Sequence, residues 1–372
     1  MRGEPRLRER LETVSPTTFS RLKAWQEKKG CGLQLLWEGE PPLAPFPAAK
    51  LGDVVHKVME AVDTNHDPAS VWDDECAKVN EKLSESPVTR GLAPLSQTVK
   101  GFELRRLMTI RMARTRAAVL HANPAVHETR SREHPLKEEM LRSLDGMLRG
   151  QFDLVERRPE GWVLVDYKSG DVLDVEGDGT AQIKESYQLQ LLLYAALLAE
   201  VKGIRIHKAL LKTLDGWEHE VPIDPAQAVK VARQARQLLD EFNKIVKKDS
   251  GDLARPLPKD NSNHIFGCMG CLYRPVCKSY LNTQRLSEEN KKWPNDAVGL
   301  VTNLNKGYDK VRITIKPRNE EREITIEFRD SPSRHQAFEK INAKDSVGIF
   351  DYVSGRTANY GGPRTCVYKM NT

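Results

Sequence analysis

Two short apolar segments joined by a polar turn bring three charged residues into one small region of the fold. Residues 148–156 and 161–169 favour strands, and the turn between them contains Pro and Gly, so the pair predicts a β-hairpin. Side chains alternate between the faces of a strand, and Asp166 and Lys168 therefore share one face. Asp153 lies on the neighbouring strand and meets them if the register of the hairpin permits.

This grouping of side chains suits the hydrolysis of a phosphodiester. Carboxylates bind a hard cation such as Mg²⁺ or Mn²⁺ through oxygen, and a magnesium site on a phosphate substrate typically uses one or two of them. A lysine beside the metal can orient the attacking water and offset the charge that develops on phosphate. An Asp-x-Lys tripeptide alone is weak evidence for a catalytic site, because it more often forms an exposed ion pair at the end of a strand.

A leucine-rich segment follows the hairpin and predicts a helix packed on the sheet. Residues 186–198 contain many helix formers and neither Gly nor Pro. Gln190 and Tyr194 are four residues apart, so they lie on one face of that helix. Taken alone, this pattern is typical of a core helix whose polar side chains find local partners.

The order of these elements resembles the PD-(D/E)XK nucleases, specifically their RecB-like branch. A strand with Asp is followed by a strand with Asp-x-Lys and then by a helix with Gln-x3-Tyr, and the resemblance covers roughly residues 15–285. It implies an α/β core of the restriction-endonuclease type, in which helices flank a mixed central sheet. The residues that it assigns to catalysis in this core are Asp153, Asp166, Lys168, Gln190 and Tyr194.

The resemblance also implies a role for each of these side chains. Asp153 and Asp166 would hold Mg²⁺ or Mn²⁺, and the backbone carbonyl of Tyr167 is a further candidate ligand. Lys168 would act on the attacking water, while the Gln and Tyr of the helix would position the substrate strand.

Two upstream segments extend the resemblance. Gly52-x3-His56 is similar to a helix near the amino end of this branch, which implies that His56 is a metal ligand or lies close to the metal. The alternative interpretation is a surface histidine on an amphipathic helix. The family places a further Glu before the hairpin, and Glu133 is the best match, followed by Glu128. The stretch from Glu133 to Gly150 is longer than in the usual family pattern.

Closely spaced cysteines in the pattern Cys-x2-Cys-x5-Cys follow the predicted core. Disulfides are not expected, because nothing marks the chain as secreted. The pattern resembles the carboxyl-terminal cysteines of iron–sulfur members of the branch, including AddB and the CRISPR-adaptation nucleases. In those proteins a fourth cysteine precedes the Gly-x3-His helix, a position that Cys31 occupies here, with Cys76 as the alternative. The implied ligands of a [4Fe–4S] cluster are Cys31, Cys268, Cys271 and Cys277. Tetrahedral Zn²⁺ is the rival metal.

Composition agrees with a soluble protein that acts on a polyanion. The chain of 372 residues is 39% hydrophobic and 30% charged, and its formal net charge is +6. The first residues lack the apolar core of a signal peptide, and the run at 189–198 is too short to span a bilayer. We therefore expect a cytoplasmic protein that binds DNA, as single strands or duplex ends, and no membrane.

The carboxyl-terminal part changes in character. Five short segments alternate apolar and polar residues, and a helix is expected between the third and fourth, which is the order of an oligonucleotide-binding (OB) barrel. Such a barrel commonly binds single-stranded nucleic acid, and docking of another protein is the alternative function. The aromatic residues that could stack on bases or fill the barrel are Tyr308, Phe328, Phe350, Tyr352 and Tyr360.

These observations predict four parts of the chain. They are an N-terminal helical region with Cys31 and the His56 helix over 1–120, a nuclease core with the cysteine segment over 121–285, a linker over 286–297, and an all-β, OB-like domain over 298–372.

The resemblance implies a metal-dependent deoxyribonuclease, acting as an exonuclease, in DNA repair, recombination or phage defence. The alternative is a catalytically silent DNA-binding or scaffold subunit of a helicase–nuclease complex. The complete set of two Asp and one Lys argues against it, because a scaffold has no chemical need for that grouping. No helicase motif is evident, so a helicase or another defence or repair subunit is an expected partner.

Overall fold

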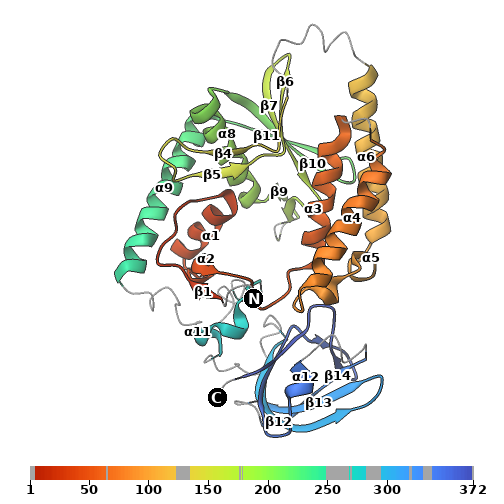
Figure 1. Ribbon diagram of the computed structural model, residues 1–372. Coiled ribbons are helices and arrows are strands. Elements are labelled where there is room, and N and C mark those ends of the chain that lie inside the picture. Colours follow the sequence, from red (N-terminus) through yellow and green to blue (C-terminus); the bar gives the residue numbers. More distant parts are fainter. Residues whose placement is uncertain are drawn as a thin grey trace.

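The structure is a computed structural model of the chain. It describes residues 5–63, 66–122, 135–175, 177, 179–248, 268, 270–281, 295–317, 321–329 and 337–370. Figure 1 shows a large α/β region above and a small β region below, at the carboxyl-terminal end of the chain.

A five-stranded mixed sheet forms the centre of the α/β region. Its strand order is β11 (Glu218–Pro222), β10 (Ile206–Thr213), β7 (Gly161–Lys168), β6 (Leu154–Arg158) and β3 (Leu136–Lys137). The pair β7–β10 is parallel, and the other neighbours are antiparallel. β7 is the middle strand, and five of its consecutive residues are buried. Such a strand needs cover on both faces, and helices supply it.

Two separate hydrophobic clusters cover the two faces of the sheet (Figure 1). α1 (Pro16–Gln26), α8 (Glu185–Lys202) and α9 (Pro225–Lys248) pack on the face that contains Leu164. α3 (Pro47–Glu60) and α4 (Pro68–Glu85) pack with α6 (Phe102–Ala122) on the face of Val163 and Val165. The predicted alternation of side chains along this strand is therefore confirmed, and apolar packing fixes the direction in which each side chain of β7 points.

The predicted hairpin forms, but its first strand is interrupted. β6 and β7 pair antiparallel from Leu154↔Val165 to Arg158↔Gly161. The residues before β6 belong to β5 (Arg149–Gln151), which pairs instead with β4 (Met140–Arg142) in a separate ribbon. Phe152 is fully buried at the break, so the chain turns there to seat an aromatic side chain in the core.

The β4–β5 ribbon lies close against α8. A Cβ atom added to Gly150 would come within 2.6 Å of Cε1 of Tyr194, whose side chain is buried. Glycine at this position lets the ribbon approach the helix, and this contact accounts for the Gly of the Gly-Gln-Phe-Asp segment.

The carboxyl-terminal region is a seven-stranded sheet. Its strands are β12 (Ala297–Lys306), β13 (Val311–Pro317), β14 (Ile324–Phe328), β15 (Ser346–Phe350), β16 (Val353–Ser354), β17 (Asn359–Tyr360) and β18 (Cys366–Lys369). Strands β15, β12, β13 and β14 are neighbours in that order, which is the Greek-key arrangement of a fourth strand returning beside the first. The expected helix between the third and fourth strands is α12 (Ala337–Lys340).

The aromatic residues of this region divide into two groups. Phe328, Phe350 and Tyr352 are buried and fill the interior, so they offer no ring to a base. Tyr308 is fully exposed and Tyr360 is about half exposed.

The remaining elements are short. They are β1 (Arg6–Leu7), α2 (Leu33–Leu36), β2 (Trp37–Glu38), α5 (Leu95–Thr98), β8 (Leu173–Val175), β9 (Ala181–Ile183), α11 (Lys278–Leu281) and 3₁₀ turns at 61–63, 90–92 and 274–276. Within the described ranges, no helix combines the length and apolar character needed to cross a membrane.

One buried arginine joins the cysteine segment to the β region. Arg274 is fully buried, and its guanidinium contacts Asp296 Oδ2 at 2.7 Å and Asp351 Oδ1 at 2.5 Å. It also donates to the carbonyl oxygens of Cys271 at 2.8 Å and Cys268 at 3.3 Å. The Arg274 side chain therefore bonds to carbonyl groups of the cysteine segment and to carboxylates of the β region.

We predict that Gly150→Ala destabilises the protein. The new methyl group must displace Tyr194, and overpacking of this kind costs about 1–3 kcal/mol. Thermal unfolding should show a Tm lower by a few degrees. Gly170→Ala is the matched control, because nothing lies within 4 Å of a Cβ added there. Equal Tm values for the two variants would contradict this account of the contact.

We predict a larger loss for Arg274→Met. This change leaves buried Asp296 without its cationic partner, and breaking a buried ion pair costs about 3–5 kcal/mol. Urea unfolding followed by fluorescence should show an earlier transition than in wild type. Arg322→Met, at an exposed position, should unfold like wild type, within about 0.5 kcal/mol. A variant of Arg274 as stable as this control would show that the guanidinium does not bind the two regions together.

Candidate metal centre

The carboxyl end of β7 carries a buried carboxylate beside a lysine. Asp166 is 2% exposed, and its Oδ2 lies 2.6 Å from Nζ of Lys168 as an ion pair. No described donor makes an aligned hydrogen bond to this oxygen. Burial raises the pKa of Asp166 to about 6, although the ammonium of Lys168 opposes the shift. A buried carboxylate that already attracts the ammonium of Lys168 is a suitable ligand for a cation.

Asp153 is fixed against the same strand from the break before β6. Its Oδ2 accepts a hydrogen bond of 2.7 Å from the backbone N–H of Tyr167, which lies directly after Asp166. Its Oδ1 lies 3.4 Å from Nδ1 of His56 on α3. The hydrogen bond from Tyr167 therefore brings the two predicted aspartates to one site.

Three side chains from three separate segments come together here. Oxygen or nitrogen atoms of His56, Glu138 and Asp153 all lie within 4.8 Å of one another. Although burial lowers the pKa of His56, its contacts with Asp153 raise it overall. Burial and the charge of Asp153 raise the pKa of Glu138 to about 7. Carboxylate oxygens and an imidazole make a donor set that fits Mg²⁺ or Mn²⁺.

Glu138 is the site residue that the sequence analysis missed. It follows β3, and its N–H donates to the Asp153 carbonyl at 3.0 Å, so backbone pairing brings it to the aspartate. Gln151 Nε2 donates to its Oε2 at 2.9 Å. The predicted Glu133 and its alternative Glu128 lie outside the described residues. One sequence feature could have identified Glu138. The stretch from Glu133 to the hairpin is longer than in the family pattern, and Glu138 lies five residues closer to the hairpin.

Gln190 links the lysine to the aspartate. Its Oε1 accepts a hydrogen bond of 3.0 Å from Lys168 Nζ, and its Nε2 lies 3.2 Å from Asp166 Oδ1. The same Nε2 lies 3.2 Å from the hydroxyl of Tyr194, which is 5% exposed. Lys168 Nζ also lies 4.7 Å from the ring centroid of Tyr187. The lysine is thus held by three groups, and the tyrosine hydroxyl meets the site through the glutamine.

Two of the predicted cluster cysteines, Cys268 and Cys271, have thiol pKa values that the other predicted cluster cysteines help to raise. Burial raises the pKa of Cys268, and Cys31, Cys271 and Cys277 raise it further. Burial likewise raises the pKa of Cys271 to about 11, with contributions from Cys31 and Cys277. Among the described residues, the cysteines do not form a group whose sulfur atoms all lie within 4.8 Å, the spacing that a single ion would require.

The alternative fourth cysteine lies elsewhere. Cys76 is buried on α4, and burial raises its pKa to about 11. The charged groups that shift this pKa are Asp73, Arg106 and two glutamates, with no cysteine among them. Of the two candidates, Cys31 is therefore the one that interacts with the carboxyl-terminal cysteines.

Comparisons with known proteins address the family of the chain. Several solved structures match, and two of them, each 14% identical to this chain, are described here. The protein named SSO0001 matches with a TM-score of 0.23, over 55% of this chain and 97% of its own. A protein from Eubacterium rectale, provisionally described as an exonuclease, matches with a TM-score of 0.37, over 74% and 90%. A search of curated proteins found no match.

A family model gives the decisive match. The model of the PD-(D/E)XK nuclease superfamily matches residues 24–278, which include the sheet, the covering helices other than most of α1, and all the residues of the candidate site. Since this match spans more than half of the chain, the protein belongs to the PD-(D/E)XK nuclease superfamily.

Proposed function

We propose that this protein is a metal-dependent deoxyribonuclease whose metal is held by Asp153, Asp166, Glu138 and His56. The observation that carries the proposal is the convergence of His56, Glu138 and Asp153 next to the end of β7, where Asp166 pairs with Lys168. Nucleases of this superfamily use divalent metals, and the donor set here suits Mg²⁺ or Mn²⁺. The backbone carbonyl of Tyr167 is a further proposed ligand.

The side chains of the site divide the chemistry between them. A bound divalent ion would supply Lewis acidity toward the phosphate and lower the pKa of a coordinated water. Lys168, held by Gln190, would orient the attacking water and offset charge on the scissile phosphate. The N–H of Tyr167 keeps Asp153 in position during the reaction. Gln190 and Tyr194, which are joined by a hydrogen bond, would position the substrate strand.

The Lys168–Gln190–Asp166 network favours an active enzyme over a silent scaffold subunit. Its two hydrogen bonds, of 3.0 and 3.2 Å, hold the lysine beside the proposed metal ligand Asp166, which is the arrangement that catalysis needs. The substrate that we propose is DNA, as single strands or duplex ends, with exonuclease action. The proposed setting is the cytoplasm, in repair, recombination or phage defence, with a helicase or another subunit as partner.

We also propose a [4Fe–4S] cluster held by Cys31, Cys268, Cys271 and Cys277, which would place the protein in the iron–sulfur, RecB-like branch. The chemistry of the donor set supports it, because Cys31, Cys271 and Cys277 are close enough to Cys268 to raise the pKa of its thiol, and four thiolates are the usual ligands of such a cluster. The backbone N–H of Cys271 donates to the carbonyl oxygen of Cys268 at 3.0 Å, which keeps these two cysteines close together. Structural Zn²⁺ is the competing occupant.

The metal centre is tested by substitution of its acids. Asp166→Asn and Glu138→Gln should each lower cleavage of labelled single- and double-stranded DNA in Mn²⁺ by at least about 100-fold, because each removes a charged metal ligand. Calorimetric titration with Mn²⁺ should show weaker binding in both variants. Asp240→Asn, at an exposed position on α9, is the control and should behave as wild type. Wild-type protein that binds DNA but does not cleave it in Mg²⁺ or Mn²⁺ would favour the scaffold alternative.

The cluster is tested by its colour and metal content. Protein purified without oxygen should be brown and carry about four iron atoms per chain. Cys31→Ser or Cys268→Ser should bleach it, whereas Cys76→Ser should not, since Cys76 lies apart on α4. Colourless protein with one zinc per chain would instead assign the four thiols to structural zinc.

A further inference from the structure

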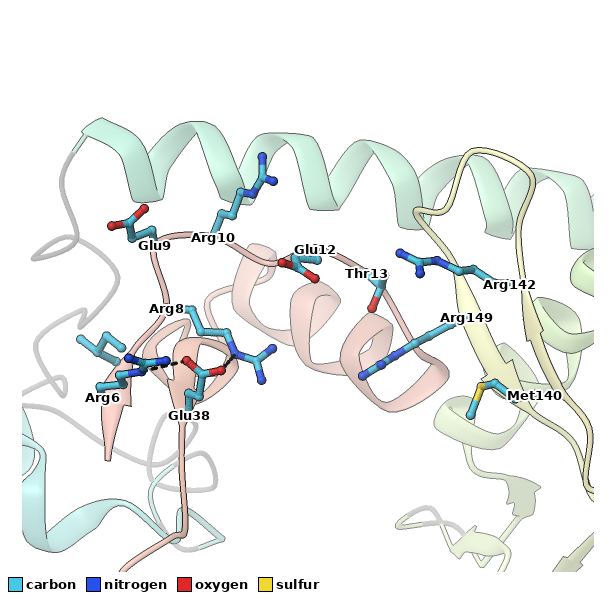
Figure 2. A pocket seen from close by; sticks show the side chains of 11 residues that line it. Arg6, Arg8, Glu9, Arg10, Glu12, Thr13, Glu38, Met140, Arg142 and Arg149 are labelled. Carbon is cyan, nitrogen blue, oxygen red and sulfur yellow. Dashed lines mark hydrogen bonds and ion pairs between the residues drawn. The ribbon is translucent and has the colours of Figure 1, made fainter. Parts of the chain in front are cut away.

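A basic pocket of about 790 Å³ lies outside the candidate metal centre, on the surface near the β4–β5 ribbon. Figure 2 shows it between the N-terminal segment and the β4–β5 ribbon. Five arginines and three glutamates line it, which leaves a formal excess of two positive charges. The arginines are Arg6, Arg8, Arg10, Arg142 and Arg149.

The two walls of this pocket are far apart in sequence but are fastened to the fold. Asn243 on α9 holds the N-terminal segment, accepting from the N–H of Leu11 at 2.8 Å and donating to its carbonyl at 2.9 Å. Val14 then pairs with the ribbon, through hydrogen bonds of 2.8 Å to the Met147 carbonyl and 3.0 Å from the N–H of Arg149. These bonds make the pocket a built part of the surface.

The arginines differ in how their charges are compensated. Glu38 faces Arg6 at 3.2 Å and Arg8 at 3.6 Å. Arg142 and Arg149 stand directly opposite each other in the β4–β5 register. Within the described residues neither forms an ion pair, and the Nε of Arg142 donates only to a backbone carbonyl of its own turn, at 3.3 Å. Like charges directly opposite each other destabilise a ribbon, and a bound anion would remove that cost.

The uncompensated arginines are close to the metal ligands. Arg149 and Gln151 are two residues apart on β5, about 7 Å along a strand, and both point to its exposed side. Gln151 in turn donates to Glu138 Oε2. A phosphate held by the arginines would therefore lie near the site where a phosphodiester is cleaved.

We propose that this pocket binds the phosphate backbone of a single strand of DNA where the strand leaves the metal centre, with Arg142 and Arg149 as the main phosphate contacts. Its volume lies in the range of small-ligand sites, which suits a few nucleotides of one strand and not a duplex. Guanidinium groups are well shaped for phosphate oxygens. This assignment rests on the proposed nuclease function and names the path of its substrate.

The test is binding of fluorescein-labelled (dT)20 to the full-length protein in EDTA, where cleavage does not occur. Arg142→Ser/Arg149→Ser should raise Kd about 10-fold at 0.1 M salt. The slope of log K against log salt should become shallower by about 1.4, because two phosphate contacts are lost at about 0.7 each. Arg142→Lys/Arg149→Lys should keep most of the binding.

Two further variants separate binding from folding and from net charge. Arg149→Glu replaces a like-charged pair by an opposite-charged one, so Tm should stay the same or rise while Kd rises. Lys78→Ser/Lys82→Ser removes the same charge from α4, which lies on the opposite side of the molecule in Figure 1, and should leave binding unchanged.

The outcomes for the pocket and for the enzyme can be told apart. If Arg142→Ser/Arg149→Ser binds (dT)20 with the wild-type Kd and salt slope, and the wild-type protein cleaves DNA in Mn²⁺, the pocket assignment alone is overturned. If that variant loses binding and the wild-type protein does not cleave DNA, the pocket assignment is supported and the nuclease function is overturned. Weaker binding of a 20-base-pair duplex but unchanged binding of (dT)20 overturns the assignment to a single strand.

Discussion

The burial of Asp166 in the middle of a hydrophobic sheet is the constraint around which this site is organised. A carboxylate removed from water is costly unless an opposite charge or hydrogen bonds compensate for it. Lys168 supplies the charge beside Oδ2, and Gln190 supplies an amide N–H to Oδ1. Asp153 and Glu138 bring further carboxyl groups to the site, which can therefore accept a cation.

Packing and chemistry are coupled through the two faces of β7. Leu164 is buried in one hydrophobic cluster, and its neighbours Val163 and Val165 are buried in the other. A slip of one residue would exchange these faces and turn Asp166 away from Gln190 on α8. The apolar side chains thus fix the register that the polar ones need, and the hydrogen bond from Tyr167 to Asp153 extends this register to the adjoining strand.

Local patterns predicted the parts of the site that lie on regular elements. Asp166 and Lys168 follow strand alternation, and Gln190 and Tyr194 follow helical spacing, so their faces could be derived from the sequence. Glu138 could not be found this way, because it lies between two short strands with a positive φ of 46° and reaches the site through backbone pairing. The break at Phe152 was missed for a similar reason, since burial of its ring depends on helices distant in sequence. The interior position of Phe328 and Phe350 also depends on the completed β region.

The guanidinium of Arg274 determines where this chain can be cut into parts. The polar stretch before Asn295 has the composition of a linker, which suggests a natural end point for an expression fragment. A fragment that stops there would lose both Asp296 and Asp351 and would uncover Leu43, which packs against Phe350. The nuclease region and the β region consequently share a single interior at this boundary. A fragment of the nuclease region that contains the cysteine segment would therefore need the β region as well, because Arg274 depends on both.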